Sequence, residues 1–149
     1  MAARNALLVV ALGAAWVHPA VADDKPYDGF GTDIAKVESG GIWKASGRWG
    51  RYRAVVRRGC SPEHCYDDLF VEWLEVIDGG ASKVVATKHV REIPGLTHVS
   101  EMKFVFPKKG TLLEVQHEGG IGDAEDRWTL CFELGPPGNY TSKPGRCAG

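Results

Sequence analysis

The segment best suited to recognition chemistry is Cys60-Ser61-Pro62-Glu63-His64-Cys65. If its cysteines pair, they enclose four residues in a rigid turn, and Pro62 suits position i+1 of a type I turn because its ring presets φ. A loop constrained in this way loses little conformational entropy when it enters a partner's cleft. Glu63 and His64 would place one negative charge and one titratable ring at the apex. We therefore expect Ser61, Pro62, Glu63 and His64 to form a binding loop, with a solvated hairpin end as the alternative.

Residues 1–22 are typical of a secretory signal peptide. Arg4 is followed by the apolar run Ala6–Val17 and then by Ala20-Val21-Ala22, the small-x-small pattern that signal peptidase recognises. The apolar run is too short to span a membrane, which takes about 20 residues, and no later segment is apolar enough to span one. We expect a periplasmic or secreted protein, with residues 23–149 forming a single β-rich domain.

The four cysteines all follow the expected signal peptide, at Cys60, Cys65, Cys131 and Cys147. An even number of cysteines in an exported chain indicates disulfides, and four cysteines allow three ways of pairing. We prefer Cys60–Cys65, which closes a hairpin tip. The other bond, Cys131–Cys147, would tie the tail Pro136–Gly149, rich in proline and glycine, to the last strand.

Most of the chain from Ile42 onward consists of short apolar or alternating segments separated by turn residues. This pattern predicts an all-β, mostly antiparallel fold of about seven strands, a disulfide-braced sandwich or open barrel. Residues 32–38 could instead form one helical turn. The expected core consists of Trp43, Tyr52, Val56, Leu69, Val71, Trp73, Val85, Phe104, Phe106, Leu113, Trp128, Leu130 and Phe132.

One hairpin register follows if Cys60 faces Cys65. Three opposite-charge pairs and three apolar pairs then form together: Arg58–Asp67, Arg57–Asp68, Arg53–Glu72, Val56–Leu69, Ala54–Val71 and Tyr52–Trp73. Such cross-strand pairs contribute about 0.2–1 kcal/mol each. A slip of one residue would turn the apolar set to the wrong face. This register favours a hairpin over residues 50–75 rather than a helix over 69–77, and it places the acidic residues on a solvated, charge-paired face.

The hairpin also resembles a known family. A Cys-x-Pro-x-x-Cys tip, with Tyr52 and Val55 before it and Trp73 after it, is similar to the inhibitory loop of the Ivy family, periplasmic inhibitors of vertebrate-type lysozyme. The resemblance covers Tyr52 to Trp73, and the rest of the chain shows neither the helices nor another motif of that mixed α/β family. It implies that the loop enters a lysozyme cleft, where the family places a histidine at the third interior position against the catalytic carboxylates. Here Glu63 has that position and His64 follows it. Because a carboxylate facing two carboxylates is repelled or takes up a proton, inhibition would need His64 to take the role.

Other classes of function find less support in the sequence. A net charge of −1 for the whole chain argues against a general nucleic-acid binder. His64, His89, His98 and His117 match no known metal-ligand spacing, so no metal or cofactor is expected. There is no nucleophile elbow, and the neighbouring Ser61, His64 and Asp67 are unlike a triad, so we do not expect an enzyme.

The function that we expect is therefore an exported binding or inhibitory module. Its partner would be a protein, and the chain would be a monomer or a weak oligomer. A periplasmic metal-binding protein and a structural protein of the cell envelope are the alternatives.

Overall fold

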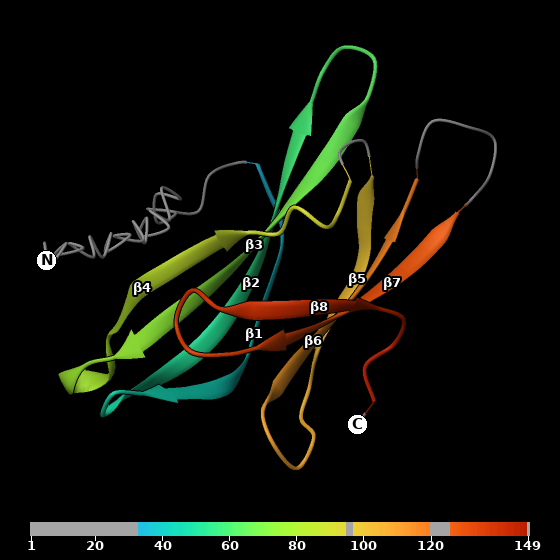
Figure 1. Ribbon diagram of the computed structural model, residues 1–149. Coiled ribbons are helices and arrows are strands. Elements are labelled where there is room, and N and C mark those ends of the chain that lie inside the picture. The colour runs from blue at the N-terminus through green and yellow to red at the C-terminus, as the bar shows by residue number, and fades with distance from the viewer. Residues whose placement is uncertain (1–32, 95–96, 120–125, 149) are drawn as a thin grey trace, which may run out of the picture.

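The computed structural model describes residues 33–94, 97–119 and 126–148, so the expected signal peptide lies outside the described residues. Two four-stranded antiparallel sheets pack face to face (Figure 1). Sheet A contains, in spatial order, β1 (Ile34–Ala45), β2 (Arg48–Cys60), β3 (Cys65–Val76) and β4 (Ser82–His89). Sheet B contains β5 (His98–Val105), β6 (Thr111–Glu118), β7 (Arg127–Leu134) and β8 (Tyr140–Pro144).

The all-β class is confirmed, in the form of a sandwich. Within each sheet, each strand pairs with the next strand in sequence. A short 3-10 turn (η1, Asp78–Gly80) joins β3 to β4, and the connection after β4 carries the chain to sheet B. Within the described ranges, no helix is long and apolar enough to cross a membrane.

The hairpin of β2 and β3 has the register that the cysteine loop predicts. Cys60 opposes Cys65, and the pairing continues without a shift to Gly50 opposite Glu75, so all six expected pairs of opposed residues are confirmed. Both expected disulfides, Cys60–Cys65 and Cys131–Cys147, are also formed.

The first strand lies where a helical turn was considered over residues 32–38, so that interpretation is wrong. β1 pairs with β2 from Ile34 opposite Arg57 onward, and this pairing satisfies the backbone of a segment with little apolar periodicity of its own. The register of β1 and β2 shifts between Gly40 and Trp43, as at a β-bulge, and Gly40 faces sheet B. A Cβ atom on Gly40 would lie 2.8 Å from the Phe104 ring, so glycine is what permits this close approach.

The tail supplies the eighth strand, one more than expected. β8 pairs with β7 from Leu134 opposite Tyr140 to Leu130 opposite Pro144. Proline is tolerated there because β8 is an edge strand.

The core lies between the two sheets and contains most of the expected residues. Buried are Trp43, Tyr52, Val56, Leu69, Val71, Trp73, Leu113 and Phe132, and partly buried against them are Val85, Phe104 and Leu130. Phe106 and Trp128 were expected in the core, but their side chains are 63% and 42% exposed. Phe106 follows the last residue of β5, and Trp128 is the second residue of β7, so both lie at strand ends.

Two acidic residues of the hairpin also differ from expectation. Asp67 and Glu72 are buried rather than solvated, at 3% and 0% exposure. Each has an arginine partner: Arg58 contacts Asp67 at 2.8 Å and Arg53 contacts Glu72 at 2.5 Å. Pairing therefore accompanies burial here, as buried charge requires.

The difference in burial between Phe132 and Phe106 can be tested by the same substitution at both sites. Phe132→Ala removes a fully buried ring and is expected to cost about 3–5 kcal/mol of unfolding free energy. Phe106→Ala removes an exposed ring and is expected to cost about 0.5 kcal/mol or less. Urea denaturation of the two variants measures both values, and equal losses would contradict the assignment of the core.

Candidate functional site

The β2–β3 hairpin extends beyond the rest of sheet A. Pairing with β1 starts at Arg57, and pairing with β4 ends at Phe70. Within the described chain, residues 59–66 form backbone pairs only with each other. Figure 1 shows this green hairpin at the top of the view, reaching past the end of β4. The expected binding loop is thus the outermost part of a projecting arm.

The tip displays all four expected binding residues. Ser61, Pro62, Glu63 and His64 are exposed, and the disulfide lies directly below them. The Ser61 N–H donates to the His64 carbonyl at 2.8 Å, and the His64 N–H donates to the Ser61 hydroxyl at 3.3 Å. In the chain-entropy model, closing so short a loop by a disulfide contributes about 2 kcal/mol to stability. The chain therefore reverses over Pro62 and Glu63 in a braced turn.

An aromatic ring covers one face of the arm below the tip. A Cβ atom on Gly59 would lie 2.7 Å from the ring of Tyr66, the residue opposite it in the ladder. The Tyr66 side chain is 36% exposed and adds an apolar surface next to the loop. Sequence reasoning missed Tyr66 as a contact residue, although an aromatic residue directly after the cysteine loop is a signal that could have indicated it.

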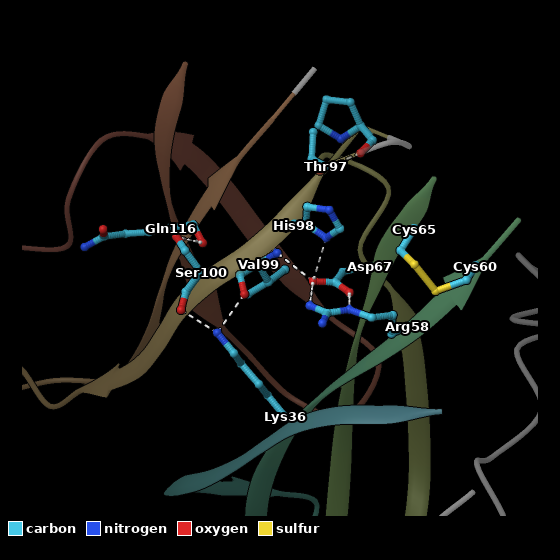
Figure 2. Close-up of polar contacts among 11 residues, drawn as sticks. Lys36, Arg58, Cys60, Cys65, Asp67, Thr97, His98, Val99, Ser100 and Gln116 are labelled. Carbon is cyan, nitrogen blue, oxygen red and sulfur yellow. Dashed lines mark hydrogen bonds and ion pairs between the residues drawn. A yellow bond between two sulfur atoms is a disulfide. The ribbon is translucent and has the colours of Figure 1, made fainter. Parts of the chain in front are cut away.

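The base of the arm is held to the opposite sheet by Asp67. Its carboxylate accepts hydrogen bonds from Arg58 at 2.8 and 3.1 Å and from the Val99 N–H at 2.9 Å (Figure 2). The Asp67 N–H also donates to the Thr97 carbonyl at 3.0 Å. The connection runs from β2 through β3 to the start of β5, so bending of the arm would break hydrogen bonds within sheet A and between the two sheets.

A lysine from β1 strengthens the same region. The Lys36 ammonium group donates to the carbonyls of Val99, at 2.7 Å, and Ser100 (Figure 2). Val99 is thus held through its N–H by β3 and through its carbonyl by β1, and this fixes where β5 begins relative to sheet A.

The ionisation of Asp67 depends on these partners. Burial disfavours the charged carboxylate, but the hydrogen bonds from Arg58 and the Val99 N–H, together with the charges of Arg58 and His98, outweigh burial and lower the pKa of Asp67 below its usual value. His98 lies close, with its Nδ1 3.6 Å from Asp67 Oδ2. A lowered pKa in the folded state means that Asp67 stabilises the fold above about pH 4 and that this stabilisation is lost as the pH falls through the folded-state pKa.

The arrangement of Ser61, His64 and Asp67 is not that of a catalytic triad. The Ser61 hydroxyl donates to the main-chain carbonyl of His64 at 3.1 Å, and the Asp67 carboxylate is bound by Arg58. The other three candidate histidines have separate neighbours, since His89 contacts Asp68, His98 contacts Asp67 and His117 stacks on Trp128. Among the residues that the structure describes, no three or more His, Cys, Asp or Glu side chains form a cluster that could hold a metal ion.

Comparison with protein-family models, curated proteins and solved structures finds no significant match to this chain.

The role of Asp67 can be separated from that of its neighbour in sequence. Asp67→Asn removes the charge that binds Arg58 and is expected to lower the unfolding free energy by about 1–3 kcal/mol at pH 7. The control Asp68→Asn, whose carboxylate is partly exposed beside His89, is expected to cost about 1 kcal/mol or less.

The measurement is urea denaturation at several pH values. The loss of unfolding free energy caused by Asp67→Asn should shrink as the pH falls below about 4. The wild-type carboxyl then takes up a proton and loses the charge that asparagine lacks at every pH. An equal loss of unfolding free energy at pH 7 and pH 3 would contradict the conclusion that the Asp67 carboxylate holds the base of the arm to β5.

Proposed function

We propose that this chain is an exported binding protein that inserts the loop Ser61–His64 into a concave site on a partner protein. One observation carries the proposal: a disulfide-closed arm that projects beyond both flanking strands and exposes all four loop residues. Two disulfides are typical of proteins in an oxidising compartment outside the cytoplasm, which supports a periplasmic or secreted location.

The physical advantage of such an arm is preorganisation. A flexible loop must be ordered when it binds, which costs about 0.5–1.5 kcal/mol for each immobilised side chain besides the cost to the backbone. Here the disulfide restrains the backbone at the tip, and Asp67 restrains the base of the arm against β5. Binding then has mainly to order the side chains of Glu63 and His64.

Within this class, the partner that we propose is a lysozyme of the vertebrate type. The support is the resemblance of the Tyr52–Trp73 segment to the Ivy family, together with the exposed, braced loop. The substrate cleft would present two catalytic carboxylates, and the imidazole of His64 can donate hydrogen bonds to them. Glu63 would weaken binding, because its carboxylate would be repelled by the two catalytic carboxylates.

Inhibition of lysozyme by the purified mature protein tests the specific partner. We expect cell-wall hydrolysis to fall at a near-stoichiometric ratio. His64→Ala should weaken inhibition about tenfold or more, and Glu63→Gln should strengthen it by removing a like charge. The matched control is Lys108→Ala with Lys109→Ala, two exposed residues in the turn between β5 and β6, which should inhibit as the wild type does. If no lysozyme is inhibited, this partner is wrong.

The broader proposal is tested by opening the loop. Cys60→Ser with Cys65→Ser removes the brace and should weaken capture of a partner from an envelope extract, whereas the control with both lysines replaced should capture it normally. Near-ultraviolet circular dichroism checks that the double variant remains folded. A folded double variant with undiminished capture would show that binding does not depend on the braced loop.

A further inference from the structure

The sandwich is open at the end that bears the arm. On sheet B, Val115 and His117 of β6 lie opposite Leu130 and Trp128 of β7, and they share the inward face with the fully buried Phe132. Exposure rises along this face from Phe132, at 0%, to Trp128, at 42%. The core face of sheet B therefore continues beyond the part that sheet A covers.

A groove of about 530 Å³ occupies this open end. Trp128 and Leu130 form part of its lining, with Pro94 from the connection after β4 and Pro144 from the end of β8. Small-molecule sites usually measure about 300–1,000 Å³ and are mostly apolar with a few polar groups. Both the size and the apolar lining of the groove fit a small ligand.

One residue of the lining, His117, is a buried histidine with an unsatisfied nitrogen. His117 is 3% exposed, its ring stacks on Trp128 at 5.4 Å between centroids, and its Nδ1 has no hydrogen-bond partner. Desolvation by burial lowers the pKa of His117, which favours the neutral ring at pH 7. A buried nitrogen without a partner is unfavourable, and a ligand in the groove could reach it only after a rotation of the imidazole ring.

Positive charge flanks the apolar surface. Arg127, at the start of β7, and Arg146, after β8, both border the groove. Arg127 contacts Glu118 at 3.0 Å, but their side chains are 66% and 41% exposed, and such a surface pair contributes only about 0–1 kcal/mol and is easily opened. The rim can therefore bind an anion beside an apolar body.

We propose that this groove binds a small ligand that has a flat apolar body and one anionic group. The body stacks on Trp128 between the two prolines, and the anion contacts Arg146 and Arg127. A sugar fits less well, because its hydroxyl groups need more polar partners than proline, leucine and tryptophan side chains provide. This site is separate from the Ser61–His64 loop and does not depend on the function proposed for it.

A pair of probes tests the two parts of the ligand. 1-Anilinonaphthalene-8-sulfonate carries an anion, and N-phenyl-1-naphthylamine has the same rings without it. Titration calorimetry should show one saturable site for the sulfonate probe on the folded protein. Trp128→Ala should weaken its binding about tenfold or more, whereas the control Trp49→Ala, which removes another exposed tryptophan (46%) in β2 of the other sheet, should not. Arg146→Gln should weaken the sulfonate probe by several-fold and leave the neutral probe unchanged.

Thermal unfolding of each variant separates lost binding from lost folding, and Arg146→Gln keeps the test decisive if Trp128→Ala unfolds. Three results would overturn the proposal: no saturable binding of the sulfonate probe, binding of that probe by folded Trp128→Ala or by Arg146→Gln that equals the wild type, or equal affinity for the two probes.

Discussion

The buried carboxylate of Asp67 is the contact on which the rest of this structure depends. It binds Arg58 within the hairpin and the Val99 N–H at the start of sheet B. Lys36 binds the carbonyl of the same valine from β1. Two strands of sheet A, β1 and β3, therefore bind one residue of β5, and the sheets are connected by directional polar contacts as well as by apolar packing. A buried charge is tolerated there because its hydrogen bonds offset the loss of solvation.

This connection lies close to the open end of the sandwich. The packed core holds the sheets together in the middle of the strands. Beyond it, at the end that bears the arm, β2 and β3 continue in sheet A, and β6 and β7 continue in sheet B. Asp67 and Lys36 keep the separation of the sheets constant at the point where they part. The arm with Ser61–His64 and the groove beside Trp128 both form because these strands extend beyond the packed core.

Much of the fold could be predicted because the information was local. The hairpin register followed from two cysteines and six complementary pairs, each a property of residues that oppose one another across a single turn. The helical turn over residues 32–38 was wrong because β1 takes its conformation from β2, which follows it in the sequence. The exposure of Phe106 and Trp128 was missed because an apolar residue in a strand pattern does not show where the opposite sheet ends.

The sequence by itself determined the register of the β2–β3 hairpin and the candidate loop, and it favoured the observed pairing of the cysteines, because alternation, cysteine spacing and turn residues act over a few neighbouring positions. Only the tertiary structure decided that Asp67 is buried and bound to Val99, that Tyr66 covers Gly59, and that His117 and Trp128 line a groove. The first and third of these features depend on how the two sheets pack. The second depends on a side-chain conformation that alternation alone does not specify.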